Sequence, residues 1–275
     1  MTVIAQISDL HLKPRGQACF RVSETNMLAE RAVRGLLAQP QRPDAVVVTG
    51  DLANDDDPRE YRMAREILGR LPMPVYIIPG NHDSAAGFAS AFADFDYVPQ
   101  AAAREKFYYS VRIGDLTLVA LDSSVPGKPY GRVGDVQLEW LDKQLSDTSG
   151  PVLVAVHHPP VATGMQFMDT IGLKDADEFG AVIQRHPHVL RIMCGHVHRA
   201  VTASFAGSLV TIAPSTAHNS ALNFAKDAPA HIHLEPTIYY LHVLTDDGAL
   251  ATHTAFAEMY PGPFPVQADE GVSWP

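Results

Sequence analysis

Carboxylate, imidazole and amide side chains gather in short clusters at five separate places along the sequence. The clusters read Asp9-x-His11, Gly50-Asp51, Asn81-His82-Asp83, His157-His158 and His196-x-His198. Oxygen and imidazole donors without thiolates suit ions such as Mn, Fe, Zn or Co. The clusters therefore predict a metal centre built from carboxylates, imidazoles and an amide.

Each cluster taken alone is also compatible with an ordinary turn. Gly50-Asp51 is common turn chemistry, and Asn81-His82-Asp83 follows a Pro-Gly pair that favours a turn as well. Taken together, the clusters offer two carboxylates, four imidazoles and an amide, which are too many for one tetrahedral ion and suit two. Two ions about 3.5–4 Å apart can stabilise both the attacking and the leaving oxygen of a phosphoryl displacement.

A short apolar run precedes every cluster and predicts a strand that positions it. The runs are 3–7, 45–48, 75–78, 152–156 and 189–193. Helical periodicity at 26–38, 58–71, 136–145 and 174–184 alternates with these runs, which is typical of parallel βαβ units. Because ligands bind at the carboxyl ends of strands in open α/β sheets, we expect the five clusters to converge.

The remaining sequence predicts a hairpin and several later strands. Residues 107–113 and 116–121 form two runs joined by Gly114-Asp115, and further short strands are expected at 201–205, 209–212, 237–244 and 251–256. The prolines after Tyr260 favour an extended tail.

Composition narrows the class of protein. The chain has 275 residues, 46% of them hydrophobic, and a formal net charge of −10. The acidic balance argues against a nucleic-acid polymer as partner, because a polymer binder needs a basic surface. No secretory signal or membrane span is evident, and Cys19 and Cys194 lie too far apart in sequence to suggest a disulfide framework. We therefore expect a cytoplasmic protein that does not bind membranes.

These clusters, with the strings RPDAVVVTGDL, YIIPGNHD and VHHPP, resemble the calcineurin-like metallophosphoesterase superfamily. The similarity is to its bacterial class III cyclic-nucleotide phosphodiesterases and the related glycerophosphodiesterases. The resemblance implies an α/β fold, a four-layer αββα sandwich of two mixed sheets flanked by helices, with a small C-terminal β cap. It also implies a catalytic core at 1–199, a strand-rich cap or dimerisation region at 200–257, and an extended tail at 258–275.

The resemblance implies a role for each matching residue. One metal ion would be bound by Asp9, His11 and His198, and a second by Asn81, His157 and His196. Asp51 would bridge the two ions. His82 would lie near the phosphate and stabilise the transition state or protonate the leaving oxygen, and Asp83 would orient His82. The identity of the ions stays open among Fe, Mn, Zn and Co.

Other residues are expected around the substrate. Asn54 and His158 suit positions behind the metal ligands, and His218 matches a substrate-side histidine of the glycerophosphodiesterase branch. Arg15, Phe20 and Arg21 could line the rim of the site or belong to a solvated loop. His231 and His233 share one strand face and could form a separate metal site. The remaining histidines, expected on the surface or in the core, are His186, His188, His242 and His253.

The implied activity is hydrolysis of small phosphodiesters, either 3′,5′-cyclic nucleotides or glycerophosphodiesters, by a hydroxide held between the two ions. A phosphomonoesterase or a phosphonate ester hydrolase is an alternative, and a catalytically silent metal-binding scaffold is another. We also expect a homo-oligomer. The apolar run 237–244, with Tyr239 and Tyr240, is either its interface or an internal strand.

Overall fold

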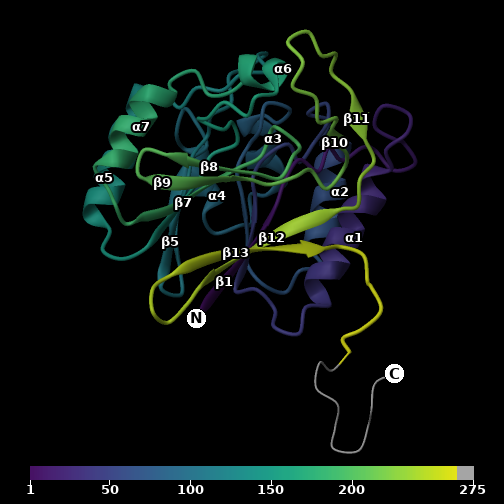
Figure 1. The fold of residues 1–275 in the computed structure, drawn as a ribbon, viewed down its shortest axis with the longest axis horizontal. Coiled ribbons are helices and arrows are strands. Elements are labelled where there is room, and N and C mark those ends of the chain that lie inside the picture. Colours follow the sequence, from purple (N-terminus) through teal and green to yellow (C-terminus); the bar gives the residue numbers. More distant parts are fainter. Residues whose placement is uncertain (265–275) are drawn as a thin grey trace, which may run out of the picture.

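The computed structural model describes residues 1–264 and builds the fold on two mixed β-sheets (Figure 1). The first sheet has the strand order β13-β12-β1-β2-β3, in which β1, β2 and β3 are parallel and β12 and β13 are antiparallel to their neighbours. Its strands are β1 (Thr2–Ile7), β2 (Ala45–Val48), β3 (Val75–Ile77), β12 (Ile238–Leu244) and β13 (Leu250–Phe256).

The second sheet has the order β4-β5-β6-β7-β9-β8, with parallel strands in its centre and an antiparallel strand at each edge. Its strands are β4 (Tyr109–Ile113), β5 (Leu116–Ala120), β6 (Val152–Ala155), β7 (Val189–Cys194), β8 (Val201–Phe205) and β9 (Ser208–Ile212). Side chains of both sheets share one core, in which Ile4 and Val47 belong to the first sheet and Leu153 and Met193 to the second.

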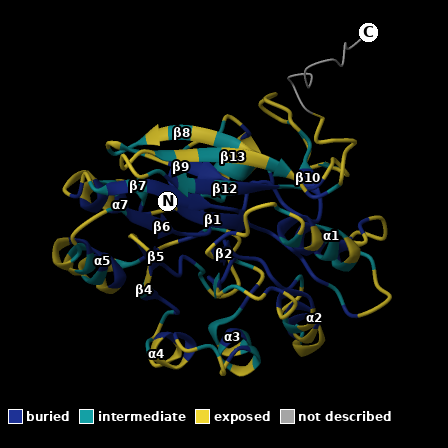
Figure 2. Cartoon of the chain, turned by 90° about the horizontal axis from the view of Figure 1, so that it is seen from below, coloured by how far each residue is buried: buried dark blue, intermediate teal, exposed yellow. Residues whose placement is uncertain are grey.

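Helices cover the outer faces of both sheets. Figure 2 shows α1 (Thr25–Leu37) and α2 (Pro58–Leu68) beside the first sheet, and α5 (Asp135–Asp147) and α7 (Ala176–Gln184) on the opposite side, beside the second. The four layers confirm the predicted αββα sandwich. A two-stranded ribbon of β10 (Asn219–Ser220) and β11 (Ile232–His233) pairs apart from both sheets and is the small C-terminal β element.

The start of α2 illustrates how local sequence sets an element. Asp57 caps the helix by accepting a hydrogen bond from the Arg59 amide at 2.7 Å, and Pro58 occupies the first turn. Glu60 completes a capping box, and its carboxylate also accepts from the amides of Asn54 (3.0 Å) and Asp55 (2.8 Å). The cap of α2 therefore also holds the loop that follows β2.

Three short helices were not predicted: α3 (Ala85–Ala91), α4 (Val98–Ala102) and α6 (Gln166–Thr170). Each has seven residues or fewer, too few to show a helical period. Local hydrogen bonds and packing fix them instead: Ser84 caps α3 by accepting from the Gly87 amide, and Phe88 of α3 is fully buried.

The tyrosine-bearing run at 237–244 is an internal strand. β12 pairs with β1 on one side and β13 on the other, and Tyr239 and Tyr240 are buried within the protein. Of the two interpretations of this run, the structure shows the internal strand. Residues 258–264 form no helix or strand, and the rest of the expected tail, 265–275, lies outside the described residues. None of the described helices has the length and apolar character needed to cross a membrane.

Candidate metal centre

The five clusters follow the carboxyl ends of β1, β2, β3, β6 and β7 and converge between the two sheets. Main-chain hydrogen bonds join the connecting loops: the Asp9 amide donates to the Gly50 carbonyl at 3.0 Å, and the His11 amide to the Asp51 carbonyl at 2.9 Å. The Gly195 amide donates to the His157 carbonyl at 3.0 Å. The loops that carry the clusters are therefore bonded to one another.

One group of donor atoms is formed by Asp9, His11, Asp51 and His198, whose ligand atoms all lie within 4.8 Å of one another. The Nε2 atoms of His11 and His198 are 3.1 Å apart, and His198 Nε2 is 3.3 Å from Asp9 Oδ1. All four side chains are buried. This grouping holds the three residues expected around one ion together with Asp51.

A second group is formed around Asn81. Its side-chain oxygen lies 3.2 Å from His157 Nε2 and 2.9 Å from His196 Nδ1. Asp51 Oδ2 connects the two groups, because it is 3.4 Å from His157 Nε2 and 3.6 Å from His11 Nε2. The arrangement is therefore two adjoining sets of donors that share one carboxylate.

The donor set fits metal ions. His157 Nδ1 lies 2.7 Å from the Thr49 carbonyl and His198 Nδ1 lies 2.9 Å from the His218 carbonyl, so each Nδ1 donates and each Nε2 faces the cluster. His11 Nδ1 and His196 Nε2 are buried and have no hydrogen-bond partner among residues 1–264. Buried imidazole nitrogens of this kind, gathered around carboxylates, are what a metal site requires.

Backbone geometry brings the ligands together at some conformational cost. Asp9, His11, Asp51, His196 and His198 all have positive φ, between 43° and 70°. Non-glycine residues in this region cost about 1–3 kcal/mol each and gather at functional sites. The strain therefore marks the loops after β1, β2 and β7 as shaped for ligand placement.

Glycines beside these residues leave room for close approach. A Cβ added at Gly80 would lie 2.1 Å from Asp51 Oδ1, and one at Gly195 would lie 2.1 Å from Ser8 Oγ. A Cβ at Gly50 would lie 2.3 Å from His157 Nδ1. The Gly-Asp, Gly-Asn-His-Asp and Gly-His motifs thus need glycine for space.

Charge coupling within the cluster is strong. Burial opposes the ionisation of Asp9, but the His198 charge and hydrogen bond keep the Asp9 pKa at about 2. Burial likewise disfavours the charged form of His157, yet Asp51 raises the pKa of His157 to about 9. Burial lowers the pKa of His196 to about 3, so this ring is neutral and available as a ligand.

His82 lies at the exposed side of the cluster. Its amide donates to Asp51 Oδ1 at 2.9 Å, and its ring lies edge-on to the His11 ring with the centroids 4.7 Å apart. His82 Nδ1 is 2.7 Å from the Asn54 carbonyl and donates to it. His82 is therefore held beside the donor atoms by the loop after β2.

The prediction that Asp83 orients His82 was wrong. Asp83 is buried and its carboxylate accepts from the amides of Leu52 (3.1 Å), Ala53 (3.0 Å) and Gly80 (3.0 Å). Burial and the nearby Asp51 charge raise the Asp83 pKa to about 7. Asp83 joins the loops after β2 and β3, whereas the main chain of Asn54 orients the His82 ring. The sequence suggested Asp83 for this role because residue types do not reveal main-chain acceptors such as the Asn54 carbonyl.

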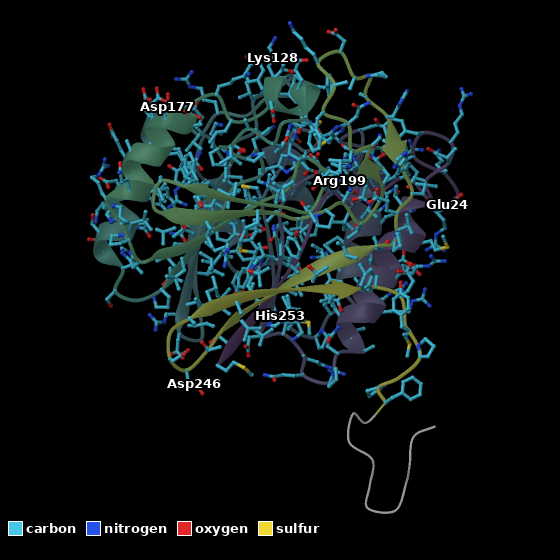
Figure 3. All side chains as sticks on the ribbon, viewed as in Figure 1. Glu24, Lys128, Asp177, Arg199, Asp246 and His253 are labelled. Carbon is cyan, nitrogen blue, oxygen red and sulfur yellow. The ribbon has the colours of Figure 1, made fainter. Side chains whose placement is uncertain are left out.

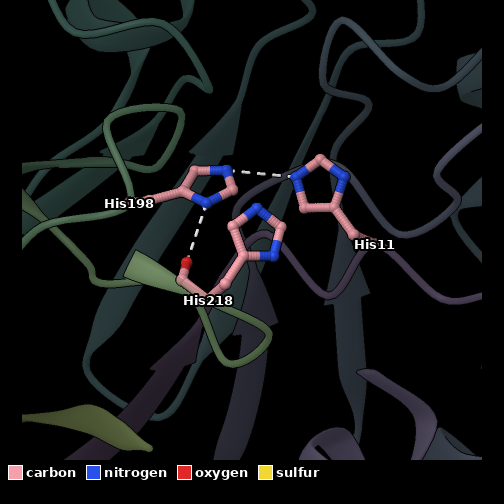
Figure 4. A group of neighbouring side chains, drawn as sticks. All are labelled: His11, His198 and His218. Atoms are coloured by element: carbon pink, nitrogen blue, oxygen red, sulfur yellow. Dashed lines mark hydrogen bonds between the residues drawn. The ribbon is translucent and has the colours of Figure 1, made fainter. Parts of the chain in front are cut away.

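His218 lies against the first group of donors, as Figure 4 shows. Its ring centroid is 4.8 Å from that of His198 and 5.4 Å from that of His11, and its Nδ1 is buried without a partner. Burial and the neighbouring His198 lower the His218 pKa to about 3. A neutral imidazole at this place can bind an ion or contact a phosphate.

The side chains of Asn54 and His158 are held by other residues, and His158 forms a metal-capable group with His157 and His196, whose ligand atoms lie within 4.8 Å of one another. The Asn54 side chain contacts Cys19 Sγ (3.2 Å) and Asp55 Oδ1 (2.9 Å). Both ring nitrogens of the buried His158 are engaged, Nδ1 with Ser123 Oγ at 2.8 Å and Nε2 with the Pro129 carbonyl at 3.2 Å. These contacts occupy both side chains, and their expected place around the substrate, behind the metal ligands, stays a prediction.

The other histidines lie outside the cluster. The metal-capable groups of three or more residues in the described part of the chain do not include His231 or His233, for which a separate metal site was one possibility. His186 Nε2 bonds Asp142 at 2.7 Å, and the buried His242 bonds Gln6 at 3.0 Å. Of the loop residues expected near the rim, Arg15 pairs with Glu66 instead.

Two positioning residues were missed at the sequence level. The Thr49 carbonyl accepts from His157 Nδ1, and Ser215 Oγ donates to the Asp9 carbonyl at 2.7 Å while accepting from the His218 amide at 3.2 Å. The position of Thr49, directly before Gly50-Asp51, could have indicated its role. Ser215 has no such signal for its contact with the metal centre, because Asp9 lies 206 residues away in sequence.

Comparison with known proteins gives a consistent result. The family model described as calcineurin-like phosphoesterase matches residues 2–200. A probable glycerophosphodiester phosphodiesterase, GpdQ, from Arcobacter nitrofigilis is 33% identical over 273 residues, covering 98% of each chain. The 3′,5′-cyclic adenosine monophosphate phosphodiesterase CpdA of Escherichia coli is 31% identical over 215 residues, covering 78% of this chain and 75% of CpdA.

Solved structures share the fold. A dimetal phosphatase from Danio rerio superposes with a TM-score of 0.64 at 17% identity, covering 94% of this chain and 99% of that one. At this identity the likeness concerns the arrangement of sheets and helices.

Proposed function

The chain belongs to the calcineurin-like phosphoesterase family, and from that premise we propose that it hydrolyses small phosphodiesters at a centre of two divalent metal ions. The observation that carries the proposal is the pair of adjoining donor sets sharing Asp51. Its relatives are named for glycerophosphodiesters and cyclic nucleotides, and we propose these two classes as substrates.

The donor sets support a specific assignment of ligands. Asp9, His11 and His198 would bind one ion, Asn81, His157 and His196 the other, and Asp51 both. The choice among Fe, Mn, Zn and Co is open, since oxygen and imidazole donors suit all four. Two bound ions would neutralise phosphate oxygens and lower the pKa of water from 15.7 to about 7.

The chain's own residues complete the chemistry. Because His82 Nδ1 donates to the Asn54 carbonyl, Nε2 is the atom that would act on the leaving oxygen: in the doubly protonated ring it gives its proton to that oxygen and is left with a lone pair. Asp51 Oδ1 accepts from the His82 amide and so ties the position of this ring to the carboxylate that both ions would share. Asp83 holds the same loops by accepting hydrogen bonds from their main-chain amides, and we propose it as a positioning residue.

The complete set of donors bears on the alternative functions. A silent scaffold would be expected to lack ligands, whereas every proposed donor is present and grouped. A phosphomonoesterase or phosphonate ester hydrolase could use the same donors, but the named relatives are diesterases. The net charge of −10 disfavours a nucleic-acid polymer as substrate.

A matched pair of substrates tests the reaction class. With metals supplied, we expect kcat/KM for bis(p-nitrophenyl) phosphate to exceed that for p-nitrophenyl phosphate, as for a diesterase. The pair is matched because both compounds release p-nitrophenolate and differ only in the second ester group. A clear preference for the monoester would contradict the proposal. Comparing cyclic AMP with glycerophosphoethanolamine would then separate the two substrate classes.

We also propose a domain division, a cellular location and an oligomeric state. The chain would divide into a catalytic core at 1–199, a strand-rich region at 200–257 and a tail at 258–275. The scarcity of cysteine favours a cytoplasmic location, and Cys19 and Cys194 are buried and unbonded to each other. Self-association into a homo-oligomer is testable by measuring the molar mass in solution.

A further inference from the structure

A cavity of about 490 Å³ opens beside the histidine cluster and takes part in none of the steps above. Its walls come from three segments: Phe20 and Val22 in the loop after β1, residues 165–168 at the start of α6, and parts of 220–232 around β10 and β11. Figure 1 shows α6 and the β10–β11 ribbon on the same side of the molecule. We call this cavity the apolar pocket.

The apolar pocket lies next to the metal centre on the side of His218. Its wall segments follow site residues in the sequence: Phe20 comes after His11, Met165 after His157 and Ser220 after His218. The Phe20 ring lies 5.1 Å, centroid to centroid, from the His218 ring. The Ser220 amide donates to the His198 carbonyl at 3.3 Å, so β10 is bonded to a proposed ligand.

The chemistry of the pocket differs from that of the metal centre. Among the described residues that line it there is no Asp, Glu, Lys or Arg. Its polar members are Gln166, Ser220, Asn223 and His231, and its largest side chains include Phe20, Phe167 and two methionines. Phe20 is 65% and Phe167 53% exposed, so two aromatic side chains of this cavity are open to water. Exposed apolar side chains grouped around one cavity are typical of a ligand-binding groove.

We propose that the apolar pocket binds a large, uncharged, apolar group of the diester while the metal centre holds its phosphate. The inference rests on the proposed function and narrows it. A cavity of this size falls in the range of about 300–1,000 Å³ typical of organic ligands, far more than glycerol needs.

Substrate preference of the unaltered protein gives the first test. p-Nitrophenyl phenyl phosphate and methyl p-nitrophenyl phosphate share a leaving group and differ in the size of one neutral, apolar ester group. We expect kcat/KM to be about tenfold higher or more for the phenyl diester, since differential burial in apolar pockets gives about 10–200-fold discrimination. Equal rates or a preference for the methyl ester would overturn the inference.

Phe167→Asp gives the second test, because it places a charge in the pocket wall at a half-exposed position of α6. We expect kcat/KM for bis(p-nitrophenyl) phosphate to fall about tenfold or more. The inhibition constant of inorganic phosphate, which has no organic group, should stay unchanged. Phe167→Leu keeps an apolar wall and should retain activity, and Phe256→Asp, at an exposed phenylalanine on β13, should change neither quantity.

The outcomes separate this inference from the function it rests on. Hydrolysis of diesters by the wild type with no effect of Phe167→Asp would overturn the pocket alone. An equal weakening of phosphate inhibition would assign the effect to the metal centre and also overturn it. A change in molar mass on substitution would show a self-association surface instead. A wild type that hydrolyses no diester would refute the proposed function itself.

Discussion

Replacing Asp51 by alanine should abolish turnover of bis(p-nitrophenyl) phosphate and the binding of at least one metal ion. Asp51 Oδ2 lies 3.4 Å from His157 Nε2 and 3.6 Å from His11 Nε2, so it is the carboxylate that both donor sets share. Loss of a residue that orients a metal ligand lowers metal affinity or activity about 10–100-fold. Loss of a ligand that both ions share should lower them further.

Two further variants make the Asp51 result interpretable. Asp51 has φ 50°, a conformation that asparagine tolerates better than alanine, so Asp51→Asn removes the charge with less strain. Asp115→Ala, at an exposed aspartate in the β4–β5 turn, should retain activity and metal content. If Asp51→Asn kept near-normal turnover with both ions bound, the shared-ligand assignment would be wrong.

Replacing His82 by alanine should slow turnover by about 10²–10⁴-fold, the usual contribution of a general acid, while leaving metal content unchanged. His82 contacts Asp51 only through its amide, which alanine keeps, and no other hydrogen bond ties its ring to the donors. Kinetics on bis(p-nitrophenyl) phosphate combined with metal analysis of the same sample separates the two effects.

His253 provides the matched control for this experiment. It is an exposed histidine on the edge strand β13, labelled in Figure 3, and His253→Ala should leave both kcat and metal content unchanged. Loss of metal from His82→Ala would show that His82 is a ligand and not a proton donor. A kcat within twofold of wild type would remove His82 from the mechanism.

The sequence predicted the placement of the donors because their order along the chain carries that information. Each cluster directly follows an apolar strand, and strand polarity alone brings Asp9, Asp51, Asn81, His157 and His196 to one end of the sheets. The αββα layers followed from the resemblance, and the structure has them.

The supporting contacts could not be predicted, since they depend on main-chain groups and on distant segments. The Asn54 carbonyl that binds His82 and the amides that bind Asp83 carry no residue-specific signal. Ser215 meets Asp9 only because β9 and β1 belong to neighbouring sheets that pack together. The apolar pocket likewise needs three segments from distant parts of the chain. Of the residues that line it, only Phe20 was considered at the sequence level as part of the rim of the site.

The net charge of −10 is compatible with an anionic substrate once the centre is considered locally. Only two carboxylates, Asp9 and Asp51, belong to the proposed ligands, and two divalent ions would reverse the local field. The charge therefore bears on extended polyanions and not on a single phosphate. Activity is therefore expected to depend entirely on bound metal.

Metal titration of the stripped protein tests this central claim most directly. The protein is freed of metal with a chelator, and turnover of bis(p-nitrophenyl) phosphate is followed as Mn, Fe, Zn or Co is added in measured equivalents. We expect no turnover without metal and full activity at about two equivalents per chain, as the two donor sets around Asp51 require. Near-normal turnover of the stripped protein, or saturation at a single equivalent, would contradict the account.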